Sequence, residues 1–193
     1  MFGSTEIPDL IDDNNFTYKK RNYLISDITA LDFTRQSTTS SFVFIPVHTS
    51  DNLDFTIYFI NNEELRINQS IKGKNKVFLE FFKFIQEHSY KNRILKYITA
   101  LEKDKYFVYN NVKFYENGNV EMLSTNKKFN INDKGMGFQY EPFNFTITPK
   151  QGFFEGIFSS KSITIEIKKD MDCFFTIISK LYSLDLNKLL SQS

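Results

Sequence analysis

The sequence predicts an α+β fold of antiparallel strands and amphipathic helices, and three observations support this class. Short segments alternate apolar and polar residues between turns rich in Asn and Gly, which is typical of antiparallel strands. Two segments that contain Phe-Phe place apolar residues at helical spacing. A hairpin followed by such a segment occurs twice, at residues 53–85 and 152–178. The 193 residues can form one large domain or two of about 90 to 100 residues.

The first half of the chain predicts several short strands and one clear hairpin. Strands are expected at residues 16–18, 23–25, 28–33 and 42–47. Pro46 cannot donate a ladder hydrogen bond, so its strand is expected to lie at an edge or to end there. Residues 53–67 predict a hairpin with its turn at Asn61-Asn62, because Asn tolerates positive φ.

The first Phe-Phe segment predicts a helix over residues 77–85. Its apolar stripe consists of Val77, Phe78, Phe81, Phe82 and Ile85. His88-Ser89 is expected to interrupt this helix, and residues 93–101 predict a second, short helix. The charged end of that segment, residues 102–105, is the best candidate for a domain junction.

The second half predicts about seven strand segments before one C-terminal helix. These are residues 106–109, 112–115, 120–123, 127–131 and 143–148, then a hairpin of residues 153–168. Asn110-Asn111 predicts a tight turn, although residues 106–115 can also be interpreted as one longer strand, and Asn117-Gly118 predicts another turn. The helix is expected over residues 170–184, with Asp170 and Asp172 in its first turn, where they can cap it and favour its dipole.

This order of strands and helix resembles the pleckstrin-homology-like (PH-like) superfold. The matching stretches are residues 106–115, the Asn117-Gly118 turn, residues 128–133, 162–167 and 174–181. Similar strings, including residues 93–97 leading into 102–106, occur in uncharacterised bacterial proteins with PH-like domains. The resemblance implies two related PH-like modules, residues 1–102 and 103–193, each a curved antiparallel sheet closed by a C-terminal amphipathic helix. The first module is one hairpin short of the second.

Composition restricts the function classes. The formal net charge of +1 gives no overall attraction to nucleic acid, so no nucleic-acid partner is expected. The single cysteine, Cys173, excludes an internal disulfide and is expected to be a buried, inert thiol. The N-terminus has neither the basic nor the apolar region of a signal peptide, and no run is long enough to span a membrane. A cytoplasmic protein is therefore expected.

Catalytic and metal-binding motifs are missing from the sequence. Ser50, His48 and Asp51 are too close in sequence to converge on one reacting atom. One cysteine and two distant histidines give no zinc-ligand spacing. Lys72-Gly73-Lys74 lacks the pattern of a phosphate-binding loop. We therefore expect no catalytic residue, no cofactor and no metal.

Lys19, Lys20 and Arg21 are the one candidate ligand-binding loop. PH domains that bind phosphoinositides place Lys and Arg in the loop after the first strand, and these three residues occupy a loosely similar turn. The resemblance therefore implies an anionic ligand at this turn. In a chain rich in lysine, a solvated turn is the simpler interpretation.

The sequence favours a non-catalytic binding or scaffolding protein with a protein partner. One alternative is an immunity-type protein that neutralises a bacterial toxin. Another is peripheral binding to anionic membrane lipid through the lysine loops. An enzyme is the least favoured class, and a deep pocket with buried Asp or Glu side chains would be needed to support it.

Overall fold

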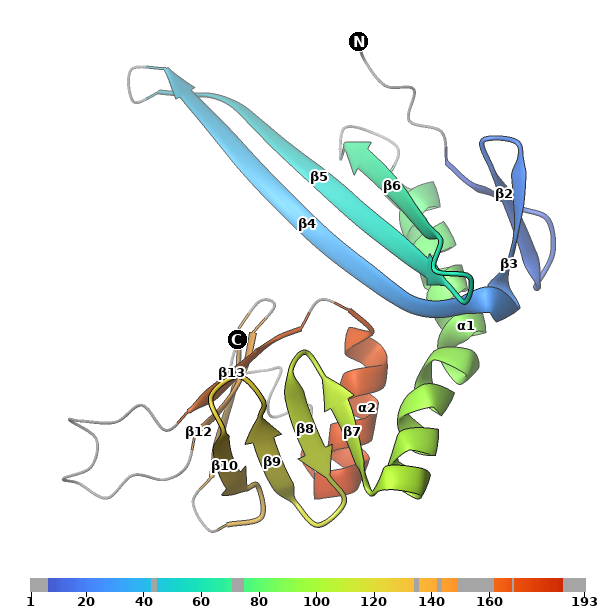
Figure 1. Cartoon of the computed structure of the whole chain (residues 1–193). Coiled ribbons are helices and arrows are strands. Elements are labelled where there is room, and N and C mark those ends of the chain that lie inside the picture. The colour runs from blue at the N-terminus through green and yellow to red at the C-terminus, as the bar shows by residue number, and fades with distance from the viewer. Residues whose placement is uncertain are drawn as a thin grey trace. The chain divides into compact units, whose positions relative to one another are not determined.

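The protein has an α+β fold, as the sequence predicts, with four antiparallel sheets and two α-helices (Figure 1). The computed structural model describes residues 7–42, 45–70, 75–133, 136–141, 144–148, 162–167 and 169–185. Within these ranges each sheet is open and none closes on itself. The chain divides into two compact units, Met1–Arg93 (unit 1) and Ile94–Ser193 (unit 2). The predicted PH-like modules, 1–102 and 103–193, remain a prediction.

Unit 1 contains two three-stranded sheets, of order β1-β2-β3 and β4-β5-β6. Its elements are β1 (Asp9–Leu10), β2 (Asn15–Tyr18), β3 (Arg21–Leu24), the 3-10 helix η1 (Ile25–Asp27), β4 (Ile28–Phe42), β5 (Ile45–Phe59), β6 (Glu64–Ser70) and the first part of α1 (Asn75–Asp104). Lys19 and Lys20 adopt φ of 49° and 64° in the turn between β2 and β3, and Asn62 adopts 64° between β5 and β6. Both predicted turns are therefore confirmed.

Strands β4 and β5 are much longer than the sequence predicts. Each has 15 residues, and they pair from Ile28↔Phe59 to Phe42↔Ile45. The predicted strand over residues 42–47 is wrong, because Phe42 ends β4, Ile45 begins β5, and these two residues pair with each other. Among the described residues, β6 pairs with β5 only between Asn52 and Tyr58, so Pro46 lies beyond the part of β5 that β6 covers. Polar residues between the two apolar segments hid this continuity.

The predicted interruption of the first helix at His88-Ser89 is wrong, because α1 continues through it to Asp104. Ser89 Oγ donates to the Ile85 carbonyl at 2.6 Å, and His88 Nδ1 lies 2.9 Å from the Phe84 carbonyl oxygen. Both side chains therefore bond to their own helix rather than to a competing turn. Buried Arg93 donates through Nε to Ser89 Oγ at 3.0 Å, which extends this internal bonding.

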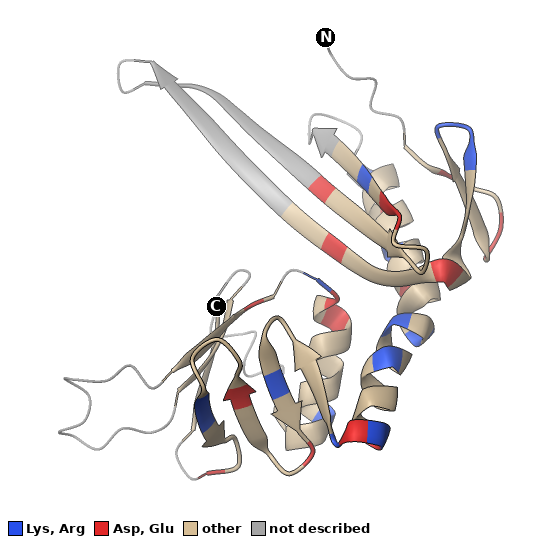
Figure 2. Cartoon of the chain, viewed as in Figure 1, with Lys and Arg blue, Asp and Glu red and all other residues tan. Residues whose placement is uncertain are grey.

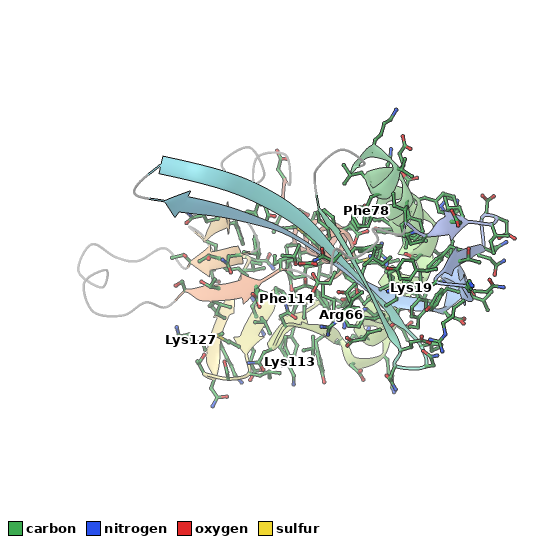
Figure 3. All side chains as sticks on the ribbon, turned by 90° about the horizontal axis from the view of Figure 1, so that it is seen from above. Lys19, Arg66, Phe78, Lys113, Phe114 and Lys127 are labelled. Carbon is green, nitrogen blue, oxygen red and sulfur yellow. The ribbon has the colours of Figure 1, made fainter. Side chains whose placement is uncertain are left out.

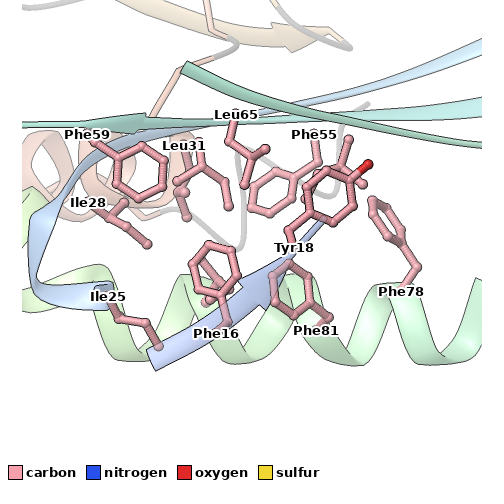
Figure 4. Packing of buried hydrophobic residues seen from close by; sticks show 13 residues of the cluster. Phe16, Tyr18, Ile25, Ile28, Leu31, Phe55, Phe59, Leu65, Phe78 and Phe81 are labelled. Atoms are coloured by element: carbon pink, nitrogen blue, oxygen red, sulfur yellow. The ribbon is translucent and has the colours of Figure 1, made fainter. Parts of the chain in front are cut away.

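The core of unit 1 lies where α1 meets both sheets (Figure 4). The Phe81 ring lies 5.4 Å from Phe16 on β2 and 6.4 Å from Phe55 on β5. Phe82 packs on Phe55 at 4.8 Å and on Phe33 of β4 at 4.6 Å. The Phe-Phe pair of α1 therefore connects the two sheets through aromatic contacts.

Unit 2 contains a four-stranded sheet of order β10-β9-β8-β7 and a three-stranded sheet of order β11-β12-β13. Its strands are β7 (Tyr106–Tyr109), β8 (Val112–Tyr115), β9 (Asn119–Met122), β10 (Lys127–Asn130), β11 (Gly137–Glu141), β12 (Asn144–Thr148) and β13 (Ile163–Glu166). The helix α2 (Met171–Tyr182) follows. Gly118 has φ of 91° in the turn before β9, a conformation that favours glycine.

β13 pairs with β12, which the sequence did not predict. The sequence predicts a hairpin between residues 153–158 and 163–168. Residues 149–161, including the first strand of that hairpin, lie outside the described ranges, so the hairpin remains a prediction.

The core of unit 2 is built around the Phe-Phe pair of α2. Phe174 is fully buried and lies 5.5 Å from Phe114 on β8 and 5.9 Å from Phe145 on β12. Phe175 packs on Phe145 at 5.8 Å. Cys173 is buried, as predicted. This helix therefore contacts both sheets of its unit.

The hairpin β2–β3 of unit 1 and the hairpin β7–β8 of unit 2 have the same internal arrangement. Phe16 and Tyr23 stack with ring centres 5.1 Å apart, and Phe107 and Phe114 also stack at 5.1 Å. In both hairpins the first Phe is followed two residues later by a Tyr, and then by two residues with positive φ. These two residues are Lys19 and Lys20 in unit 1, and Asn110 and Asn111 in unit 2. Tyr23 therefore corresponds to Phe114, and β3 corresponds to β8.

The three-stranded sheets β4-β5-β6 and β11-β12-β13 also share one register. Both central strands contain Phe-Thr-Ile, at residues 55–57 and 145–147, with the Phe and Ile buried. The cross-strand pairs are Phe55↔Ile67 and Ile57↔Leu65 in unit 1, and Phe145↔Ile165 and Ile147↔Ile163 in unit 2. The counterpart of β5 in this sheet is therefore β12. The sequence comparison suggested the segment 152–158, which lies outside the described ranges.

The two units differ beside β3. In unit 2 the strand β8 pairs with β7 on one side and with β9 on the other. In unit 1 the chain leaves β3 through η1 and enters β4, so β3 is an edge strand of the described sheet β1-β2-β3. No described segment of unit 1 takes the place that β9 occupies in unit 2.

Candidate functional site

The strongest candidate site is a groove of about 420 Å³ along the edge of β3, which we call the β3 groove. Two stretches far apart in sequence form it: β3 with η1, and the turn between β5 and β6. Its lining residues are Arg21, Asn22, Tyr23, Leu24, Asp27, Phe59, Asn61 and Glu63.

Aromatic stacking fixes the floor of the β3 groove. Tyr23 stacks on Phe16 at 5.1 Å and on Phe59 at 5.2 Å, which joins the two sheets of unit 1. The Ile60 N–H donates to the Asp27 carbonyl at 2.9 Å and holds the turn against η1. The groove therefore has a rigid base rather than being a gap between loops.

The charges of the β3 groove do not favour an anionic ligand. Arg21 Nη1 lies 3.2 Å from Glu63 Oε1, an exposed pair of small energetic value. Asp27 accepts a hydrogen bond at 3.3 Å from the hydroxyl of neighbouring Ser26. The lining thus contains two carboxylates and one guanidinium, and that guanidinium is already paired.

An exposed apolar side chain lines the β3 groove. Leu24 is 48% exposed. A neutral to acidic groove with an aromatic floor and an exposed apolar side chain suits a protein segment better than a charged small molecule.

The predicted anionic-ligand residues lie in the turn of the β2–β3 hairpin, where basic residues gather (Figure 2). Lys19, which is labelled in Figure 3, has its Nζ 5.1 Å from the centre of the Tyr18 ring. Lys19 and Lys20 are exposed, whereas Arg21 lines the β3 groove and pairs with Glu63. The three residues thus do not share one pocket, and their binding of an anion remains a prediction.

Unit 2 contains a second cavity, of about 310 Å³, beside the start of α2. Its lining residues are Lys96, Tyr97, Ala100, Phe107, Val108, Tyr109, Asn110 and Lys169. The Tyr109 hydroxyl donates to the Lys169 carbonyl, and the Asn110 amide donates to the Glu166 carbonyl. These bonds connect the β7–β8 hairpin to the segment before α2.

Asp170 is a buried carboxylate, and the sequence did not predict its burial. Lys96 Nζ lies 2.5 Å from Asp170 Oδ2, and the Tyr97 hydroxyl donates to the same oxygen at 3.3 Å. Asp170 is the N-cap residue of α2 with φ of 52°, but its side chain makes no capping bond. The predicted capping role is therefore wrong, because the carboxylate pairs with Lys96 and Tyr97 instead.

Tyr97 is expected to make the folding stability depend on pH. Burial and then the charge of Asp170 raise the pKa of the Tyr97 phenol far above its ordinary value of 10.0. Above pH 10 the unfolded chain releases this proton while the folded chain keeps it, so folding stability falls as the pH rises. We expect a loss of about 1.4 kcal/mol per pH unit from this residue.

The measurement is urea unfolding between pH 9 and 11.5 of the wild type and Tyr97→Phe. The variant lacks the titrating hydroxyl, so its stability should decline less steeply by that amount. Equal slopes for the two proteins would contradict the assignment. Burial also raises the pKa of Tyr182, which adds a second contribution of the same sign to both proteins.

The remaining sequence candidates do not form a site in the described structure. The side chains of His48, Ser50 and Asp51 lie outside the described residues. The His88 ring stacks on Phe84 at 3.8 Å. Among the residues that the structure describes, no three His, Cys, Asp or Glu side chains are grouped to hold a metal ion. No described helix combines the length and apolar character that a bilayer span needs.

Comparison with protein-family models, curated proteins and solved structures finds no match to this chain.

Proposed function

We propose that this chain is a non-catalytic binding protein built from two PH-like modules, and that it acts by contacting another protein. The single observation that carries the binding role is the β3 groove, with its stacked aromatic floor and the exposed Leu24 in its lining. Exposed apolar side chains beside a concave surface are typical of protein contacts.

The order of elements supports the PH-like assignment. In the described part of unit 2, the strands β7 to β13 precede the amphipathic helix α2. Six of these strands match predicted segments, β11 was not predicted, and the predicted strand at residues 153–158 lies outside the described ranges. Phe174 and Phe175 of that helix contact both sheets of the unit. In unit 1, Phe81 and Phe82 occupy the same relation to their two sheets. The corresponding contacts favour two related modules.

A pull-down from the native host, washed at about 0.5 M salt, tests the binding role. We expect the tagged wild-type chain to retain one stoichiometric protein, and Leu24→Asp to lose it, because a charge in the lining opposes an apolar contact. Leu10→Asp is a matched control. Leu10 is 43% exposed on β1, the opposite edge strand of the same sheet, so its substitution should leave capture unchanged.

Failure of capture by the wild type would contradict the proposed role. The favoured rival is then peripheral membrane binding through Lys19, Lys20 and Arg21, each worth about 1 kcal/mol near an anionic surface. It would appear as flotation with phosphatidylserine vesicles that salt reverses and that Lys19/Lys20/Arg21→Ala abolishes.

A further inference from the structure

The open edge of β3 corresponds to a strand edge that is occupied in unit 2. Tyr23 and Phe114 hold the same place in their hairpins, stacked on Phe16 and Phe107 respectively. In unit 2, Phe114 pairs with Val120 of β9 across the opposite edge. In the described part of unit 1, β3 pairs with β2 alone.

The backbone of β3 is oriented to accept another strand. Tyr18 and Arg21 flank the two-residue turn, so they form a hydrogen-bonded pair, and bonding then alternates along the strand. Asn22 and Leu24 therefore direct their N–H and C=O groups away from β2. None of the backbone hydrogen bonds seen among the described residues joins these groups to another strand.

The β3 groove lies along this edge. Asn22, Tyr23 and Leu24 line it, so an incoming strand would enter a hollow that exists already. In unit 2, β9 places the fully buried Val120 against Phe114 and directs Glu121 outward beside Lys113. The same geometry at β3 would place an apolar side chain against Tyr23 and Phe59.

We propose that β3 binds an extended segment of a partner protein as an antiparallel strand, in the place that β9 occupies in unit 2. The segment has Val or Ile opposite Tyr23, because this is the position of Val120. Its neighbouring residues lie opposite Asn22 and Leu24, and the Leu24 side chain favours an apolar contact there. The inference rests on the proposed protein-binding function and specifies the class of partner.

Selection of a random heptapeptide phage library on the full chain tests this inference. We expect enriched peptides to have a central Val or Ile, opposite Tyr23, with an apolar residue on the side that lies opposite Leu24. Asn22→Pro removes the outward N–H and keeps every backbone hydrogen bond to β2. It should weaken the binding of these peptides at least about tenfold. Asn22→Ala keeps the N–H and is the matched control, with affinity within about threefold of the wild type.

Hydrogen exchange on the wild-type chain gives a second readout that does not depend on the Pro variant. The Asn22 and Leu24 amides should exchange rapidly in the free protein and slow down when a selected peptide binds. Peptides that bind Asn22→Pro as tightly as the wild type, or a library that gives no binder, would overturn strand pairing at β3.

The outcomes separate this inference from the proposed function. A host protein captured equally by the wild type and Asn22→Pro overturns strand pairing and leaves the protein-binding role intact. Selected peptides that bind β3 while the host pull-down stays empty support the edge and contradict the cellular role.

Discussion

Phe174→Ala is expected to lower the free energy of unfolding by about 3–5 kcal/mol, the largest effect of any single change considered. Phe174 is fully buried on α2 and packs on Tyr109, Phe114, Phe145 and Phe175. Truncation removes the contacts that join α2 to both sheets of unit 2 and leaves a cavity that these rings cannot fill.

Urea unfolding followed by circular dichroism measures this loss. Lys180→Ala is the control, because Lys180 is exposed on the same helix and should change stability by less than about 0.5 kcal/mol. A loss below about 1 kcal/mol for Phe174→Ala would show that α2 does not form the centre of this core.

Lys96→Met should give the second large effect, a loss of about 2–4 kcal/mol. The Asp170 side chain is fully buried, and Lys96 is the cation paired with it at 2.5 Å. Removing the cation leaves a buried carboxylate without that charge partner, which costs far more than breaking an exposed pair. Lys96 itself is partly exposed, so the loss should stay below that of a fully buried pair.

Two further variants separate the ion pair from packing. Lys96→Arg keeps the charge and should cost less than about 1 kcal/mol. Lys96→Met/Asp170→Asn removes both charges while Asn tolerates the left-handed backbone, so it should be more stable than Lys96→Met alone. Thermal unfolding of these four proteins and of Asp170→Asn decides this, and additive losses of the two single variants in the double variant would contradict a coupled pair.

The sequence predicted those features that local chemistry determines. The turns at Asn61-Asn62 and Asn110-Asn111 were predicted because Asn tolerates positive φ. The turn at Lys19-Lys20 was predicted from a charged run between two apolar segments, and nothing in the sequence indicated its positive φ. Most of the predicted apolar stripe of the first helix is buried, because burial imposes helical spacing, but Val77 is 56% exposed and does not belong to the buried face. The repeated Phe-Phe pairs occupy corresponding places in the two cores.

Features that depend on long-range contacts were missed. The β3 groove combines residues 21–27 with residues 59–63, and nothing in either stretch indicates the other. Likewise, nothing in the sequence around Lys96 indicates its contact with Asp170, which lies 74 residues away. An Asp directly before a helix suggests a cap, and only the position of Lys96 reveals the pair. The pairing of β13 with β12 was missed because a long connection separates these two strands in the sequence.

The helix α1 has a consequence for any attempt to isolate half of the protein. Its first part gives Phe78, Phe81 and Ile85 to the core of unit 1, and its last part gives Lys96 and Tyr97 to unit 2. A fragment that starts at residue 103 would keep every strand of unit 2 but would lack the cation for Asp170 and the ring that covers Phe107. In the sequence, a cut within the charged residues 102–105 looks harmless. It would nevertheless remove part of the interior of the unit 2 fragment.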